Sequence, residues 1–382
     1  MPLTLLRVAG QGLEFVAFVV FARRLGTAGF GQLSVAFLIA RYGFLLADWG
    51  ASVQGPRDVA AQRAPAELRG LMRHRALVGA IGGAVFAVVS VAAKAPEVAP
   101  LGLVVVAGGI SRDWYALGRE RGVAAGWPIA ARGAVLAAIA PLVTAVGGAA
   151  ILLGGAYVLA AVVSVVVNRL PGESPVGFGR PGVAAWMLVG VLMAQIYTTL
   201  DTILLGWISG DGEAGVYAAV YRIPQAWVTV TGLVVAALVP VTTSVLTEDI
   251  SHLGHLRARA TRAGLVGAAA LLVITPLAVA LVVPIFGSQY ASGRAPLVLL
   301  MIATAISTIT APLGAIYLGV GEDETFAKVL TLGAVLNVLT NLVAIPAFGM
   351  TGAGATTAAS EALVLILMLR ALHSVEASRA AP

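Results

Sequence analysis

Ten ionisable side chains lie inside long apolar stretches of this 382-residue sequence. A charged side chain costs about 2.5–3.5 kcal/mol at the centre of a membrane helix, so a purely structural membrane protein would gain stability without most of them. We therefore expect these side chains to face a hydrated chamber or one another. In chain order they are Arg7, Glu14, Arg41, Asp48, Arg112, Asp113, Arg132, Asp201, Arg222 and Glu361.

The arginines of this set are unevenly distributed, because four of the five lie in the first half of the chain. Arginine pairs bidentately with phosphate oxygens and stays charged when it is buried. A chamber lined by guanidinium groups would therefore suit a diphosphate. The candidate diphosphate-binding residues are Arg41, Arg112, Arg132 and Arg222.

A structural alternative explains the same charges without any ligand. In this interpretation the side chains form ion pairs within the protein, and Arg7 extends to the inner membrane surface. The pairs would be Arg112 with Asp113, Arg41 with Asp48, and Asp201 with Arg222. Arg41 and Asp48 are seven residues apart, so they share one face of a helix.

The second half of the chain is more polar than charged. Its hydroxyl and amide side chains recur at helical spacing and could hydrogen-bond a sugar or join helices, a contact that contributes about 0.6 kcal/mol. Joining helices suits Asn337 and Asn341 better. The candidate glycan-binding residues are Gln195, Thr198, Thr199, Tyr217, Tyr221 and Gln225, and Thr202 continues the first row.

Four intramembrane acids are candidates for binding a coupling ion, either a proton or Na⁺. A carboxylate at membrane depth is a common element of proton and ion pathways. These residues are Glu14, Asp48, Asp201 and Glu361.

The composition indicates the elements that must position these residues. Hydrophobic residues make up 59% of the chain and charged residues 11%, against roughly 25% charged in soluble domains. A membrane helix needs about 20 apolar residues. We predict an all-α membrane protein with about twelve spans, at 3–21, 29–54, 75–93, 99–118, 124–146, 147–168, 182–206, 215–240, 263–285, 295–318, 325–347 and 350–372.

The positive charges in the loops predict the orientation, because cytoplasmic loops carry an excess of Lys and Arg. With the N-terminus in the cytoplasm, fifteen of these residues, Arg75 among them, fall on the cytoplasmic side and four on the outer side. We therefore expect a multi-pass protein of the cell (inner or plasma) membrane with both termini in the cytoplasm. Basic residues spread over short loops do not indicate nucleic-acid binding.

The two halves of the chain resemble each other over a short stretch. "TAGFGQLSVAF" at 27–37 and "EAGVYAAVY" at 213–221 align at an offset of 186 residues, close to half the length. Parallel six-helix repeats with a site between them are a transporter architecture. We predict two six-helix lobes around a central cavity, at 1–168 and 182–372, with a cytoplasmic linker at 169–181 and a short tail at 373–382.

Several kinds of chemistry have no support in the sequence. The chain has no cysteine, no phosphate-binding loop and neither a GxSxG nor an HExxH motif. We expect no enzymatic activity, no metal and no cofactor.

Four stretches resemble the polysaccharide and O-antigen flippases of the multidrug/oligosaccharidyl-lipid/polysaccharide exporter superfamily. They are "RRLGTAGFGQLSVAF", "LADWGASVQGPRDVA", "DTILLGWISGDGEAGVYAAVYRIPQ" and "NVLTNLVAIPAFGMTGAGATTAASEALVLIL". The resemblance implies alternating access and a polyprenyl diphosphate-linked oligosaccharide carried from the inner to the outer leaflet. It also implies membrane lipids and polysaccharide polymerase machinery as partners. The chain begins almost directly in its first span, so a native start upstream of Met1 stays open.

Two other functions stay open beside the flippase. A cation-coupled drug antiporter of the same superfamily would predict an acid-dominated binding lobe. A membrane-embedded polysaccharide polymerase or ligase would predict a long outer loop with catalytic residues, and the outer gaps here are short.

Overall fold

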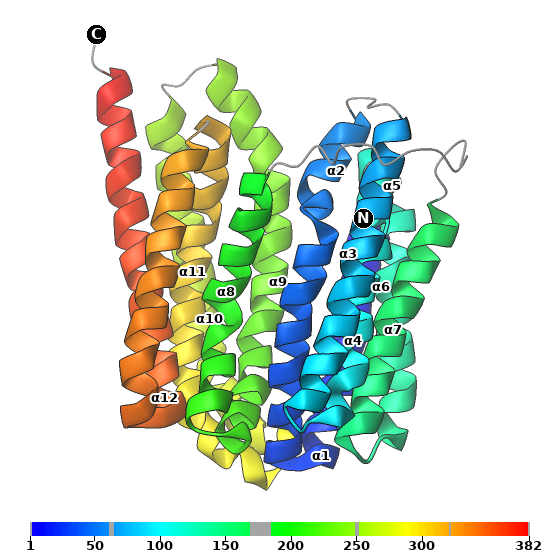
Figure 1. The fold of residues 1–382 in the computed structure, drawn as a ribbon. Coiled ribbons are helices and arrows are strands. Elements are labelled where there is room, and N and C mark those ends of the chain that lie inside the picture. The colour runs from blue at the N-terminus through cyan, green and yellow to red at the C-terminus, as the bar shows by residue number, and fades with distance from the viewer. Residues whose placement is uncertain (1, 61–64, 169–184, 249–251, 321, 381–382) are drawn as a thin grey trace. The chain divides into compact units, whose positions relative to one another are not determined.

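The structure, a computed structural model, describes residues 2–60, 65–168, 185–248, 252–320 and 322–380. Every regular element among these residues is a helix, as Figure 1 shows. The predicted all-α class is therefore confirmed. The chain divides into two compact units, residues 1–195 and 196–382.

The described part of the first unit consists of α-helices and short 3-10 helices. Its elements are α1 (Pro2–Asp48), α2 (Ala51–Ala60), α3 (Pro65–Ala92), η1 (Pro96–Leu101), α4 (Gly102–Ile110), α5 (Asp113–Gly118), α6 (Gly122–Ile139), η2 (Ala140–Leu142) and α7 (Val146–Val167).

Helix α1 contains two antiparallel spans joined at Gly26. Gly26 has φ 72° and ψ 179°, a backbone conformation outside the helical region that glycine adopts readily. The rings of Phe18 and Phe37 lie 5.6 Å apart, although a straight helix would separate them by about 28 Å. The chain therefore reverses at Gly26, between the predicted spans 3–21 and 29–54.

The fourth predicted span, 99–118, is not one continuous helix. It consists of η1, α4 and α5, and Ser111 and Arg112 form a break between the last two. The prediction of one continuous helix across 99–118, with Arg112 inside it, is therefore wrong, because Ser111 is extended, with φ −62° and ψ 145°. The apolar composition that indicated a span gave no sign of this interruption.

Small residues let the helices of the first unit approach closely. A Cβ atom added to Gly133 of α6 would lie 2.1 Å from the carbonyl oxygen of Gly10 on α1. Such contacts are typical of membrane helix pairs, in which packing replaces the hydrophobic effect.

The second unit begins within α8 (Ala185–Ile208). The remaining elements are α9 (Asp211–Glu248), α10 (Leu253–Phe286), η4 (Ser288–Gly293), α11 (Arg294–Val320) and α12 (Asp323–Ala380). The predicted linker, 169–181, lies outside the described residues, and the predicted lobe boundaries stay a prediction.

Helix α12 reverses at Gly349 as α1 does at Gly26. Gly349 has φ 56° and ψ −140°. The hydroxyl of Thr356 donates to the side-chain oxygen of Asn341 at 2.6 Å, across a sequence separation that spans about 22 Å in a straight helix. The predicted spans 325–347 and 350–372 are thus the two arms of one hairpin.

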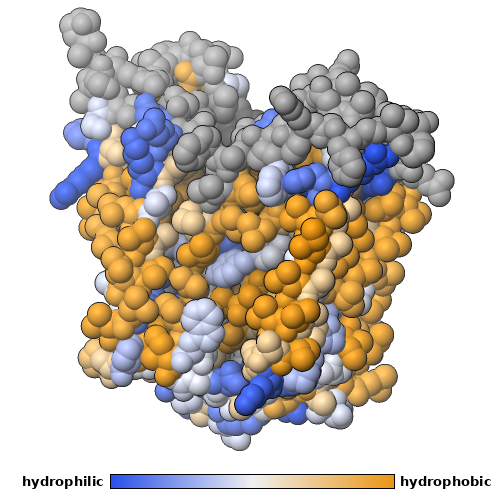
Figure 2. Space-filling model, in the orientation of Figure 1, coloured by the Kyte–Doolittle hydropathy of each residue, from blue (hydrophilic) through white to orange (hydrophobic). Residues whose placement is uncertain are grey.

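Seven helical stretches of the described chain are long and apolar enough to cross a membrane. The stretches Leu3–Asp48 and Glu324–Ser374 each contain one of the two reversals. In Figure 2, hydrophobic side chains cover the middle of the helices on the visible face of each unit, and hydrophilic ones gather toward the ends. The chain is a multi-pass membrane protein.

Candidate functional site

One ion pair of the predicted site joins α1 to α6. Arg132 and Glu14 lie 2.7 Å apart, nitrogen to oxygen, and about 15% of each side chain is exposed. The guanidinium carbon of Arg132 also lies 4.3 Å from the centroid of the Tyr157 ring on α7. This is a favourable cation–π geometry in a desolvated setting.

Arg41 reaches the same tyrosine from the second arm of α1. Its guanidinium donates to the Tyr157 hydroxyl at 3.3 Å and lies 5.3 Å from the centroid of the Phe44 ring. Within the described residues Arg41 has no carboxylate partner. We call Glu14, Arg41, Arg132 and Tyr157 the Tyr157 cluster. It contains two of the four predicted diphosphate residues and one predicted ion-binding acid.

Tyr157 was missed by the sequence analysis. It is 4% exposed and is the single polar side chain in the apolar segment 151–163. That isolation is the signal that could have found it, since a buried tyrosine hydroxyl needs a hydrogen-bond partner.

Asp48 pairs with Arg75 rather than with Arg41. The Arg75 guanidinium lies 2.7 Å from one Asp48 oxygen, and the other oxygen accepts from the Ser52 amide at 2.9 Å. Arg75 is fully buried, so its assignment to the cytoplasmic loop cations is wrong. The alternative pairing of Arg41 with Asp48 is also wrong: both residues belong to α1, but their side chains have different partners.

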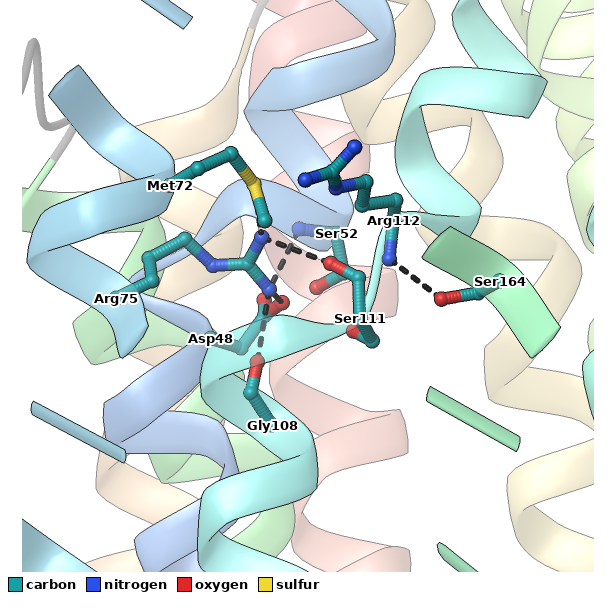
Figure 3. A network of polar contacts seen from close by, with 8 residues as sticks. All are labelled: Asp48, Ser52, Met72, Arg75, Gly108, Ser111, Arg112 and Ser164. Carbon is teal, nitrogen blue, oxygen red and sulfur yellow. Dashed lines mark hydrogen bonds and ion pairs between the residues drawn. The ribbon is translucent and has the colours of Figure 1, made fainter. Parts of the chain in front are cut away.

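Arg112 lies at the break between α4 and α5. Its backbone amide donates to the hydroxyl of Ser164 on α7 at 2.9 Å, and its side chain is half-buried. Figure 3 shows the side chain leaving in a different direction from that amide. The neighbouring Asp113 is in electrostatic contact with Arg132, Arg7 and Arg75, so it belongs to a wider charge network than a single pair with Arg112.

Positive charge is in excess among these intramembrane side chains of the first unit. Arg7, Arg41, Arg75, Arg112 and Arg132 stand against Glu14, Asp48 and Asp113, which leaves two unbalanced guanidinium charges. Electrostatic interactions are stronger in a low-dielectric interior than in water. An anion would therefore be favoured over a cation in this unit.

In the second unit, Asp201 is the centre of a hydrogen-bonded group. Its carboxylate accepts from the Tyr217 hydroxyl at 2.5 Å, from the Thr202 amide at 2.8 Å and from the Thr357 hydroxyl at 3.4 Å. Asp201 and Tyr217 are both buried. The structure thus ties a predicted glycan residue, Tyr217, to a predicted ion-binding acid.

A second acid lies near this group. Glu361 of α12 is in electrostatic contact with Tyr197 and Tyr221, and Tyr221 is also in electrostatic contact with Asp201. The rings of Tyr217 and Tyr221 are stacked with their centroids 6.0 Å apart. Two carboxylates and a tyrosine pair therefore gather between α8, α9 and α12.

The remaining predicted binding residues of the second half of the sequence lie on α8 and α9. Gln195, Thr198 and Thr199 are half-buried on α8, Arg222 is half-buried on α9, and Gln225 is exposed on α9. Their roles in binding a glycan or a diphosphate stay predictions. Asn337 and Asn341 bond to each other at 3.1 Å, and the Thr356 contact then ties the arms of α12 together, as expected for helix-joining residues.

Among the described residues, no group of three or more His, Cys, Asp or Glu side chains could hold a metal ion.

The family model described as polysaccharide biosynthesis protein matches residues 182–245. No curated protein matches the sequence.

Solved structures match nearly the whole chain. An inward-facing multidrug resistance MATE family transporter of the MOP superfamily aligns with a TM-score of 0.76 at 13% identity, covering 97% of this chain and 96% of that chain. The lipid II flippase MurJ in an inward closed conformation aligns with a TM-score of 0.71 at 10% identity, covering 97% and 87%. A MOP superfamily transporter from Pyrococcus furiosus, whose binding pocket is described as having reverse polarity, gives a TM-score of 0.61 at 13% identity, covering 98% and 95%.

These matches agree with the resemblance to lipid-linked sugar flippases found in the sequence. The chain is therefore a multi-pass membrane protein whose fold is similar to that of solved MOP superfamily transporters, and its residues 182–245 match the family model described as polysaccharide biosynthesis protein.

Proposed function

We propose that this protein flips a polyprenyl diphosphate-linked oligosaccharide from the inner to the outer leaflet of the cell membrane, for the synthesis of cell-surface polysaccharide. It would do so by alternating access and without forming or breaking a covalent bond. The observation that supports this proposal best is the Tyr157 cluster, in which two guanidinium groups meet on one buried aromatic side chain inside the membrane-spanning unit.

Arg41 is the first contact for the anionic head group. Its guanidinium is not matched by a carboxylate among the described residues, and its tyrosine and phenylalanine contacts leave N–H donors for phosphate oxygens. Arg132 holds Glu14 in the present state, so a diphosphate would compete with Glu14 for that guanidinium. Arg112 and Arg222 would add donors as the head group advances.

The glycan would be bound by the polar side chains of the second half, in particular Gln195, Thr198 and Thr199. The second unit would also couple transport to a cation. Asp201 and Glu361 are better placed for H⁺ or Na⁺ than Glu14 and Asp48, because each of the latter already has an arginine partner. Both termini would lie in the cytoplasm, and polysaccharide polymerase machinery would consume the product in the outer leaflet.

A cation-coupled drug antiporter is the second candidate, and the buried acids of the second unit favour it. A cationic drug would bind near Asp201 and Glu361, whose surroundings carry two tyrosine rings that suit cation–π contacts. The arginine excess of the first unit favours the flippase. No observation favours a polysaccharide polymerase or ligase.

The experiment uses proteoliposomes and a polyprenyl diphosphate-linked sugar with a fluorescent label that dithionite quenches from one side. Arg41→Gln should slow translocation by about tenfold or more, because a hydrogen bond to a charged group contributes about 1.5–3 kcal/mol. Arg41→Lys should retain part of the activity. Arg24→Gln, an exposed arginine at the α1 reversal, is the matched control and should behave as the wild type.

Ethidium efflux measured in the same proteoliposomes separates the two candidates. If the wild-type protein uses a proton gradient to drive ethidium efflux and does not translocate the labelled lipid, the antiporter is established and the flippase is overturned. Normal lipid translocation by both Arg41→Gln and Arg132→Gln would overturn the role of the Tyr157 cluster.

A further inference from the structure

The break between α4 and α5 lies inside the predicted span 99–118 and contains no proline. Its two residues are Ser111 and Arg112. Irregular backbone at membrane depth is tolerated only where its polar groups find partners inside the protein. Figure 3 shows which side chains supply them.

Two hydrogen bonds of a continuous helix are exchanged at this point. In a continuous helix the Arg112 amide would donate to the Gly108 carbonyl, but here it donates to the Ser164 hydroxyl at 2.9 Å. The Tyr115 amide would donate to the Ser111 carbonyl, but here it donates to the Arg112 carbonyl at 3.0 Å. The carbonyls of Gly108 and Ser111 thus lose their helical donors.

Arg75 of α3 donates to both of these carbonyls. One guanidinium nitrogen lies 2.8 Å from the Gly108 oxygen and the other lies 3.0 Å from the Ser111 oxygen. The same guanidinium pairs with Asp48 and lies 5.8 Å from the centroid of the Trp114 ring on α5. A single buried side chain therefore contacts both sides of the break and has its charge balanced.

The packing around the break keeps Arg75 in reach. A Cβ atom on Gly109 would lie 2.4 Å from the Arg75 carbonyl oxygen, and one on Gly108 would lie 2.4 Å from the Phe44 carbonyl oxygen. Helix α4 thus packs closely against α3 and α1 at Gly108 and Gly109, just before its regular hydrogen bonding ends.

We propose that Arg75 is a positioning residue, which holds the fourth span broken and thereby sets the place of the Arg112 side chain. The role of Arg112 in binding the diphosphate rests on the proposed function. Without Arg75 the Arg112 amide would return to the Gly108 carbonyl, and ψ of Ser111 would rotate by about 170° to reach the helical value. The Arg112 side chain would then point in a different direction from the one that Figure 3 shows.

The natural absence of cysteine allows a test that does not depend on transport. Arg112→Cys places a single thiol at the break, and its reaction rate with 2-aminoethyl methanethiosulfonate reports its surroundings. The rate is compared with and without the double substitution D48N/R75Q, which removes both members of the ion pair so that no lone charge stays buried. We expect the labelling rate of this thiol to change by at least about fivefold, because a continuous helix would turn the side chain at position 112 to a different environment.

Two further variants control for a general loss of structure. Ser164→Ala removes the acceptor of the Arg112 amide without changing any charge, and should shift the labelling rate in the same direction. Arg119→Gln, an exposed arginine just after α5, should leave the rate unchanged. An unchanged rate in D48N/R75Q would overturn the proposal, whatever the rate in Ser164→Ala.

The link to substrate binding is tested in chains that retain Arg112. In D48N/R75Q the KM for the labelled lipid-linked sugar should rise by at least about fivefold, while the maximal rate falls less. A changed labelling rate with an unchanged KM would overturn the positioning role. If the wild type moves no lipid-linked sugar, the proposed function fails, and the labelling rates alone decide whether Arg75 holds the break.

Discussion

Arg41 donates a hydrogen bond to the hydroxyl of Tyr157 at 3.3 Å, although 116 residues separate them in the chain. The ring of the same tyrosine lies 4.3 Å from the guanidinium carbon of Arg132. Two like charges are thus held near one another by an aromatic side chain that offers a hydroxyl to one and a ring face to the other. Their mutual repulsion would be relieved by an anion bound between them.

This arrangement predicts a graded response to changes at Tyr157. Tyr157→Phe removes the acceptor of Arg41 and keeps the ring, so the KM for lipid-linked sugar should rise by a factor of about two to ten, the equivalent of one ordinary hydrogen bond. Tyr157→Leu also removes the cation–π contacts and should raise the KM further. The order wild type, Phe, Leu is measured in proteoliposomes, and equal KM values for all three would contradict the prediction.

The Glu14–Arg132 pair predicts a rescue of stability by a second substitution. Arg132→Gln alone leaves the Glu14 carboxylate in the membrane interior without its partner. Breaking a fully buried ion pair costs about 3–5 kcal/mol. The loss of stability should be smaller here, because both side chains are partly exposed. The double variant E14Q/R132Q removes both charges and should recover much of the loss. Thermal unfolding in detergent measures both variants, and a double variant no more stable than Arg132→Gln would show that the pair is not the cause.

The membrane spans could be predicted from the sequence because length and apolarity alone define them. The two reversals are also readable, since Gly26 and Gly349 stand between apolar runs and both adopt conformations that other residues disfavour. The break at Ser111 could not be predicted, because its cause is a side chain on another helix. No local proline marks it.

The partners of the buried charges were less predictable than their presence. Arg75 stands beside Arg73 and His74 at the start of an apolar run, so it was counted with the loop cations although it is fully buried. Its pairing with Asp48 depends on how closely α3 packs against α1 and α4. Glycine contacts set this distance, and a single sequence does not reveal them. Spacing within one helix indicated the face of Asp48 but not its partner.

The reversal of α12 predicts a stabilising cap. A carboxylate oxygen of Glu213 on α9 accepts from the Met350 amide at 3.0 Å, at the start of the second arm, where the first amides of a helix lack partners. Glu213→Ala should lower the stability of the protein by about 0.5–2 kcal/mol, and Glu213→Gln by less, since its amide oxygen can accept the same bond. The midpoint of thermal unfolding in detergent measures this, and Asp211→Ala, an exposed acid on the same turn, is the control.

The Asp201 group predicts how ion coupling should respond to two substitutions. If Asp201 binds the coupling cation, Asp201→Asn should abolish the dependence of lipid translocation on a proton or Na⁺ gradient while leaving downhill translocation. Tyr217→Phe removes one hydrogen bond to the carboxylate and leaves those from Thr202 and Thr357, so it should shift the half-saturating ion concentration by about tenfold or less and preserve coupling. Translocation is measured at imposed pH or Na⁺ gradients. Full coupling in Asp201→Asn would exclude the Asp201 carboxylate as the ion-binding group. Glu361→Gln would then be the decisive variant, because Glu361 is the other acid in electrostatic contact with Tyr221.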